Sequence, residues 1–193
     1  MRYAFGSGKR TTHHAPPTTG ARKGLSVNHT LSVIVEDKPG VLARVSSLLA
    51  RRGFNIHSLA VGPSHEDGLS RMTIVVDAPE VEQVKKQLHK LINVVKISEF
   101  DPVFSIEREI MLVRVAGGPG KRGEILEIAS IFDAIAVDVG AQSISFQIAG
   151  DPRKVSDFLE LVRPYGLIEL VKSGRVALAR EPKGRPAKLR AVT

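Results

Sequence analysis

The sequence predicts an α+β protein in which the order strand-helix-strand-strand-helix-strand occurs twice. Two observations support this fold class. Segments in which apolar and other residues alternate, as in half-buried strands, are separated by segments with apolar residues at helical spacing. The order of these segments between residues 29 and 101 then returns after Asp101-Pro102, although the two halves share few identical residues.

The first half contains four predicted strands and two predicted helices. Leu31, Val33 and Val35 alternate along the first strand, and the loop 62–68, rich in Gly, Pro and Asp, joins two strands that must run antiparallel. One apolar stripe marks the second helix through Val81, Val84, Leu88 and Leu91. The predicted strands span 30–36, 54–62, 69–77 and 93–100, and the predicted helices span 40–52 and 80–91.

The second half repeats this order. The predicted strands span 107–116, 134–139 and 142–149, with a last strand or strand pair at 166–180. The two helices carry the apolar stripes Ile125, Ile128, Ala129, Phe132 and Val155, Phe158, Leu159, Val162. Antiparallel sheets with their helices on one face, in a βαββαβ order, form a ferredoxin-like fold. We therefore expect two ferredoxin-like domains, at residues 29–101 and 102–181.

The two ends of the chain differ in composition from the body. The net charge is +8, but residues 1–28 hold five basic residues and no acid, and residues 182–193 hold four and no acid. Both ends are too poor in apolar residues to order themselves, so we expect disordered basic tails there. The body at 29–181 then carries a charge of −1. A nucleic-acid-binding domain concentrates positive charge on a folded face, so no nucleic-acid partner is expected.

Other classes are excluded or disfavoured by composition. The chain contains no cysteine, so disulfides and thiolate chemistry are impossible. No apolar run approaches the roughly 18 residues that cross a bilayer, and the first 28 residues lack the apolar core of a secretory signal. We therefore expect a cytoplasmic protein that does not associate with membranes.

The most informative local feature is the turn Asp37-Lys-Pro39-Gly40 between the first strand and the first helix. A strand that stops at a glycine and restarts as a helix leaves unpaired backbone N–H groups pointing at one place. These donors and the helix dipole favour a carboxylate, and Gly40 allows close approach because it has no side chain. The turn therefore suits the carboxylate end of a free amino acid.

Several blocks of the sequence resemble one known family. They are the run from His29 to Val45, Arg51-Arg-Gly-Phe-Asn-Ile56, Ser58-Leu-Ala-Val61, Ser70 to Val76, Lys86 to Ile92, Glu107 to Arg114, Gly166, and Ser173 to Arg180. The first blocks resemble an ACT domain. The whole set is similar, in order and spacing, to the regulatory (small) subunit of acetolactate synthase, over roughly residues 29–181.

The resemblance implies a subunit without chemistry of its own. It would pair with a large catalytic subunit that carries thiamine diphosphate, Mg²⁺ and FAD, raise the activity of that subunit, and transmit feedback inhibition by valine. Leucine and isoleucine would bind more weakly than valine but would not be excluded, since one methylene changes the binding free energy by only ~1–3 kcal/mol. The resemblance also implies a homodimer that pairs through its ACT domains.

By position, the family places the effector between two ACT domains. The turn would supply Asp37, Pro39 and Gly40 with the backbone of Val41 and Leu42. The facing domain would supply Asn55 and Ile56. The sequence departs from many relatives at Asp37, where they have Asn, and at His57, where they have Glu. Asp37 still accepts a hydrogen bond from an ammonium group, so valine binding is expected to survive.

Two other functions compete with this interpretation. A free-standing ACT-domain sensor, acting on another enzyme or regulator, is the second candidate. A small nucleotide-dependent enzyme is the third, because Gly118-Pro-Gly120-Lys-Arg-Gly123 fits G-x-G-x-x-G, follows a strand and precedes Asp138 by a suitable distance. Against it, the next strand follows too closely for a parallel crossover, and Val115 and Arg122 break the phosphate-loop pattern. The histidines show no ligand spacing, and no catalytic group is recognisable.

Overall fold

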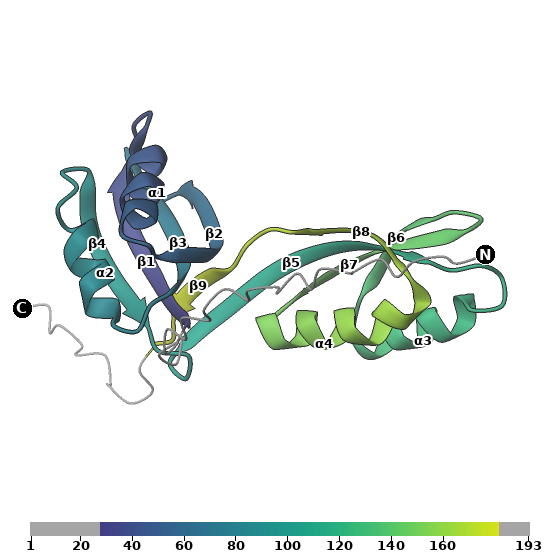
Figure 1. Cartoon of the computed structure of the whole chain (residues 1–193). Coiled ribbons are helices and arrows are strands. Elements are labelled where there is room, and N and C mark those ends of the chain that lie inside the picture. Colours follow the sequence, from purple (N-terminus) through teal and green to yellow (C-terminus); the bar gives the residue numbers. More distant parts are fainter. Residues whose placement is uncertain (1–27, 182–193) are drawn as a thin grey trace, which may run out of the picture.

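The computed structural model describes residues 28–181, and the chain folds into two α+β units joined end to end (Figure 1). The predicted tails lie outside these residues, except that Asn28 begins the first strand. The N-terminal elements are β1 (Asn28–Glu36), α1 (Val41–Arg51), β2 (Asn55–Pro63), β3 (Leu69–Asp77), α2 (Val81–Leu88) and β4 (Val94–Phe100). The C-terminal elements are β5 (Ser105–Ala116), α3 (Arg122–Ile131), β6 (Ile135–Val139), β7 (Ser143–Gly150), α4 (Pro152–Val162), the 3₁₀ turn η1 (Arg163–Tyr165), β8 (Leu167–Lys172) and β9 (Val176–Ala179).

The N-terminal sheet has the strand order β2-β3-β1-β4, and every neighbouring pair is antiparallel. Both helices lie on one face of this sheet (Figure 1). Their buried side chains pack against alternate residues of the strands, in a core that includes Leu31, Val33, Val35, Val41, Val45, Leu49, Met72, Ile74, Val76, Val84 and Leu88. The predicted ferredoxin-like fold and the predicted apolar stripes are therefore confirmed in this half.

Helix α2 is shorter than predicted. The sequence pattern extended it to Leu91, but the helix ends at Leu88. Beyond that residue, the amides of Lys90 and Leu91 donate to carbonyls three residues back, at 3.1 Å each, instead of four. The chain therefore tightens into a turn, while Leu91 still packs against the core. An apolar stripe shows which residues face the core but not where the helical hydrogen bonds stop.

The C-terminal sheet has the order β6-β7-β5-β8, again antiparallel throughout, with α3 and α4 on one face. Phe146 and Phe158 are fully buried at its centre, with their ring centroids 6.1 Å apart. Helix α4 is capped by Asp151, whose carboxylate accepts hydrogen bonds from the amides of Arg153 and Lys154 at 3.1 and 3.0 Å. These hydrogen bonds lower the pKa of Asp151, that from Lys154 most strongly, against an opposing effect of burial.

The last predicted strand is resolved as two strands with different partners. β8 pairs with the second half of β5, whereas β9 pairs with its first four residues, Ser105 to Arg108. β5 also begins two residues earlier than predicted. We call residues 173–179, which include β9, the arm. The arm returns from the C-terminal sheet to the N-terminal domain (Figure 1).

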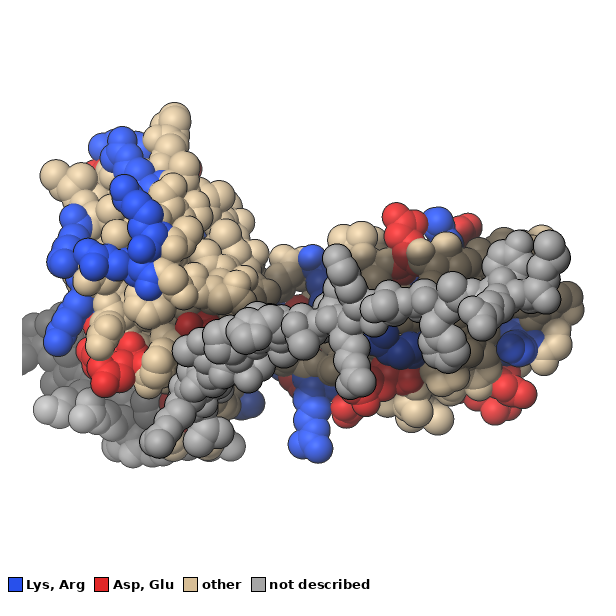
Figure 2. Space-filling model, viewed as in Figure 1, with Lys and Arg blue, Asp and Glu red and all other residues tan. Residues whose placement is uncertain are grey.

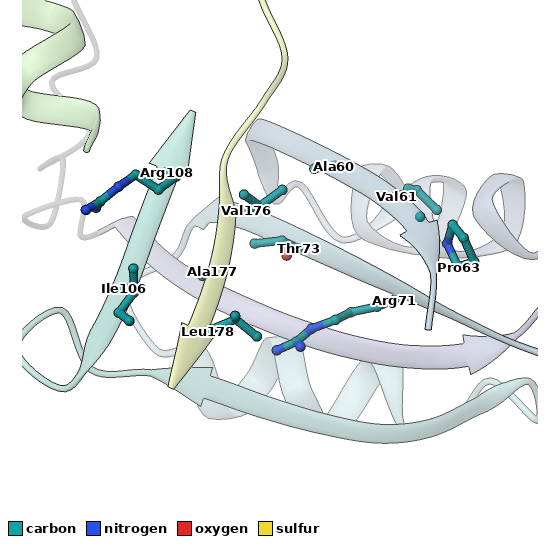
Figure 3. A pocket seen from close by; sticks show the side chains of 11 residues that line it. Ala60, Val61, Pro63, Arg71, Thr73, Ile106, Arg108, Val176, Ala177 and Leu178 are labelled. Atoms are coloured by element: carbon teal, nitrogen blue, oxygen red, sulfur yellow. The ribbon is translucent and has the colours of Figure 1, made fainter. Parts of the chain in front are cut away.

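The arm changes the environment of the N-terminal sheet. An antiparallel sheet covered mainly on its helical face was predicted, but Thr30, Ser32, Thr73 and Val75 on the opposite face are also buried. Figure 3 shows the arm residues Val176 to Leu178 lying across this second face, beside Thr73. The strand pattern did not reveal this cover because small polar residues are typical of a solvated face.

Candidate functional site

The turn after β1 is exposed and open. Asp37, Pro39 and Gly40 all lie at the surface, and the amide of Asp37 donates to the carbonyl of Gly68 at 2.8 Å. Gly40 has φ = +82°, the left-handed conformation that glycine adopts without strain, and no atom lies within 4 Å of where a Cβ would stand. Gly40 is thus needed for the backbone conformation and also leaves space above the turn.

The first turn of α1 offers free hydrogen-bond donors. No acceptor within residues 28–181 pairs with the amides of Leu42 and Ala43, and no side chain caps the helix. The amide of Val41 differs from expectation, because it already donates to the carbonyl of Lys38 at 3.3 Å. The helix dipole adds positive potential here, and no acid occupies the first turn. This geometry suits a carboxylate, which would bind mainly to the two free amides.

A polar network centred on the buried side chain of Asn93 lies beside the turn. Asn93, 7% exposed, receives a hydrogen bond from the Arg44 guanidinium at 2.7 Å and donates one to the Glu36 carboxylate. The amide of Glu36 also donates to the carbonyl of Asn93 at 2.9 Å. The hydrogen bond from Asn93, and then that from Lys38, lower the pKa of Glu36. The network therefore links the end of β1, the first turn of α1 and the start of β4.

The contribution of Asn93 and Arg44 to this network was not predicted from the sequence. The only indication was a lone polar residue within the apolar run Leu91-Ile-Asn-Val-Val95, since a polar residue in such a run needs partners if it is buried. Nothing in the sequence pointed to Arg44 or Glu36 as those partners.

The second half of the predicted site lies elsewhere in the same chain. Asn55 and Ile56 begin β2, where Asn55 is paired with Asp77, whereas the end of β1 is paired with Leu69. Eight residues along β3 separate these positions, which corresponds to roughly 26 Å. Within one chain, the structure therefore does not bring Asn55 and Ile56 to the Gly40 turn.

His57 occupies an irregularity in β2. The register of the β2–β3 ladder shifts between Ile56 and Ser58, so that His57 has no paired residue on β3. Its Nε2 lies 3.9 Å from the carboxylate of Asp77. His57, where this sequence differs from many relatives, thus lies next to Asn55 and Ile56 and away from the Gly40 turn.

The Gly118–Gly123 segment is the loop between β5 and α3 together with the first two residues of α3. The following strand β6 does not continue a parallel sheet, because β5, β6 and β7 are all connected through antiparallel ladders. The Arg122 guanidinium closes the loop by donating to the carbonyls of Gly117, Gly140 and Ala141 at 3.3, 2.7 and 3.2 Å. The sheet of a doubly wound dinucleotide-binding fold is absent from the described residues.

The helical side of the N-terminal domain is basic. Lys and Arg side chains gather over α1 and α2 (Figure 2), and those on the helices are Arg44, Arg51, Lys85 and Lys86.

Across residues 28–181, no three His, Asp or Glu side chains form a group that would hold a metal ion. None of the helices described is long and apolar enough to cross a membrane.

Two ferredoxin-like domains, the first with an exposed Gly turn that leads into a helix, define a two-domain protein of the ACT type. The model of the AHAS small subunit-like ACT domain matches residues 31–96, and the model of the small subunit of acetolactate synthase matches residues 108–181. The chain belongs to the family of acetolactate synthase small subunits.

Individual relatives agree with this assignment. The chain is 53% identical over 159 residues to a probable acetolactate synthase small subunit of Archaeoglobus fulgidus, covering 81% of this chain and 99% of the relative. It is 51% identical to the acetolactate synthase small subunit of Mycolicibacterium smegmatis, covering 81% and 93%. The crystal structure of the acetolactate synthase small subunit from Thermotoga maritima superposes with a TM-score of 0.74 at 37% identity, covering 80% of this chain and 98% of that chain.

Proposed function

We propose that this chain is the regulatory subunit of an acetolactate synthase: it binds the catalytic subunit, raises its activity and makes it sensitive to valine. The observation that carries the proposal is the Gly40 turn, which presents two free amides in a chain similar to acetolactate synthase small subunits over both of its domains. The catalytic subunit would supply thiamine diphosphate, Mg²⁺ and FAD, and this chain would supply none of them.

The turn can bind a zwitterion through both of its charges. The amides of Leu42 and Ala43 would donate to the effector's carboxylate, and the exposed carboxylate of Asp37 would accept from its ammonium group. Leu42 is 42% exposed and offers apolar surface to a branched side chain. The neighbouring Val35 and Val41 are 1% and 4% exposed and belong to the core, so their side chains offer no such surface.

A second copy of the chain would complete the site. Asn55 and Ile56 lie too far from the turn within one chain, whereas a homodimer would bring the start of one β2 to the turn of its partner. β2 is an edge strand of the N-terminal sheet, with one side of its backbone unpaired among the described residues. A site shared by two chains gives valine a means of favouring one dimer arrangement over another.

Reconstitution tests the proposal. The full chain is mixed with the large catalytic subunit, and acetolactate formation is measured with and without valine. We expect co-elution of the two proteins on size exclusion, higher activity than with the catalytic subunit alone, and loss of that activity as valine is added. Failure to associate with or stimulate the catalytic subunit would refute the proposal. Valine-induced thermal stabilisation of the chain without such association would point to a free-standing sensor.

A further inference from the structure

Strand β5 belongs to both halves of the molecule. Its residues Ser105 to Arg108 pair with the arm, while Glu109 to Ala116 pair with β7 in the C-terminal sheet. The strand continues through both ladders without interruption. One continuous, hydrogen-bonded strand therefore connects the arm directly with the C-terminal sheet.

The arm lies tightly against the N-terminal domain at Gly174. A Cβ at this position would stand 2.6 Å from the carbonyl oxygen of Leu59, closer than side chains approach backbone atoms, and Gly174 has φ = +82°. Next to it, the amide of Arg175 donates to Ser58 Oγ at 2.7 Å. Both contacts are made to β2, so the arm is fixed to this edge strand.

We call the contacts of Gly174 and Arg175 with Ser58 and Leu59 the joint. The side chain of Arg175 adds further contacts to it. Its guanidinium lies 3.0 Å from the carboxylate of Glu107 on β5 and 3.5 Å from Thr30 Oγ1 on β1. The Arg175 and Glu107 side chains are 24% and 15% exposed, so the ion pair is largely shielded from solvent and holds a defined geometry. Three strands thus meet at Arg175.

The tight contact between the arm and β2 is confined to the start of the arm. Farther along, a groove of about 350 Å³ separates Val61 and Pro63 of β2 from Val176 and Leu178 of the arm (Figure 3). The arm therefore has a tight joint at Gly174 and an open hollow beside β9. Neither Gly174 nor Arg175 belongs to either hydrophobic core.

The joint lies close to one half of the proposed effector site. Asn55 and Ile56 begin β2, and Ser58 follows three residues after Asn55, just past the irregularity at His57. A ligand that repositions the start of β2 thus acts on the residues that hold the arm.

We propose that the contact of Gly174 and Arg175 with Ser58 and Leu59 transmits effector binding from the N-terminal domain to the C-terminal domain. This inference rests on the proposed function and specifies how that site regulates the complex. The effector moves the start of β2, Ser58 and Leu59 move the arm, and β5 carries the displacement into the C-terminal sheet.

Three variants of the full chain test the transmission in the complex reconstituted with the catalytic subunit. Gly174→Ala forces the arm away from Leu59, and Ser58→Ala removes the acceptor of the Arg175 amide with little change in shape. Gly53→Ala is the matched control, because Gly53 also has a positive φ, +74°, but has no atom within 4 Å of a Cβ. Valine affinity is measured by calorimetry on each chain alone, and inhibition at saturating valine is measured in the complex.

We expect Gly174→Ala and Ser58→Ala to bind valine within about twofold of the wild-type affinity, while inhibition at saturating valine falls at least ~5-fold in Gly174→Ala and less in Ser58→Ala. Gly53→Ala should be inhibited as fully as the wild type. In the chain alone, valine should also change hydrogen exchange at the Arg175 amide. If circular dichroism shows that Gly174→Ala does not fold, the inhibition of Ser58→Ala at saturating valine tests the transmission instead.

The outcomes separate this inference from the proposed function. A wild-type complex that valine inhibits, together with arm variants that are inhibited to the same extent, overturns the transmission and leaves the proposed function standing. An equal loss of inhibition in Gly53→Ala overturns it as well. A wild-type complex that valine does not inhibit overturns valine sensitivity itself, and the transmission with it.

Discussion

Gly40 has a left-handed backbone conformation and leaves open space beside the free amides, and a substitution would affect both. Gly40→Asp places a carboxylate next to the amides proposed to bind the effector's carboxylate, so the two like charges repel. We expect the valine concentration for half-inhibition to rise at least ~10-fold, about 1.4 kcal/mol, with activation of the catalytic subunit retained. Titration of the reconstituted enzyme with valine measures this change.

The backbone conformation at Gly40 requires a control of its own. Gly53 lies at the other end of the same helix, has φ = +74° and is equally open, so Gly53→Asp introduces the same strain away from the free amides. Both variants should lose a similar amount of stability, about 1 kcal/mol, in thermal unfolding. If Gly40→Asp instead abolishes activation together with valine inhibition, the turn has a structural function and does not bind the effector.

Whether a site residue could be predicted from the sequence depended on how far away in the chain its partners lie. The Gly40 turn was predictable because strand alternation, Pro39-Gly40 and a helical stripe all lie within about twenty consecutive residues. Asn93 was not, because its partners Glu36 and Arg44 are 57 and 49 positions away in the sequence. Side-chain hydrogen bonds across such separations depend on how the strands are arranged, which no local pattern records.

Asp151 shows how one side chain stabilises the start of helix α4. Its carboxylate accepts from two amides that α4 would otherwise leave unpaired, and Pro152 occupies the first helical position. Asp151→Ala should cost about 1 kcal/mol in the free energy of unfolding at pH 7. Asp151→Asn keeps an acceptor and should cost less. Denaturant unfolding of the three proteins measures both, and equal stability of wild type and Asp151→Ala would contradict the assignment.

The same cap should titrate. The pKa of Asp151 is lowered in the folded protein from an ordinary value of 3.8, because its ionised form accepts the two amide hydrogen bonds, that from Lys154 contributing most. A lowered folded-state pKa means that the stabilisation is complete above the ordinary value and is lost as the pH falls through the folded-state value. The stability advantage of the wild type over Asp151→Asn, which does not titrate, should therefore shrink below about pH 4.

Most elements were predictable within a few residues, but their long-range partners were not. The alternation of apolar residues along β5 predicted a strand. The pattern did not indicate that the first four residues of β5 pair with β9 instead of the C-terminal sheet. The burial of Thr30 and Thr73 was unexpected for the same reason. The periodicity of a strand specifies which face is apolar, whereas the arm covers a polar face through a handful of backbone and side-chain contacts.

The separation between the Gly40 turn and Asn55 within one chain makes the proposed dimer site testable by mixing variants. Neither Gly40→Asp nor Asn55→Ala alone should bind valine well as a homodimer, because each disrupts one half of both sites. A mixed dimer differs. One of its sites combines both substitutions, and the other combines the intact turn of the Asn55→Ala chain with the intact Asn55 of the Gly40→Asp chain.

Valine binding should therefore return when the two variants are unfolded together and refolded, or co-expressed. Random pairing makes about half of the dimers mixed, each with one intact site, so roughly a quarter of all sites should bind with wild-type affinity. Calorimetry on the mixture, with each variant alone as reference, measures this fraction. The physical reason is the roughly 26 Å between the two halves within one chain, which no rotation of side chains can bridge. A mixture that binds no more valine than its components would show that each site is built within a single chain, contrary to the proposed dimer.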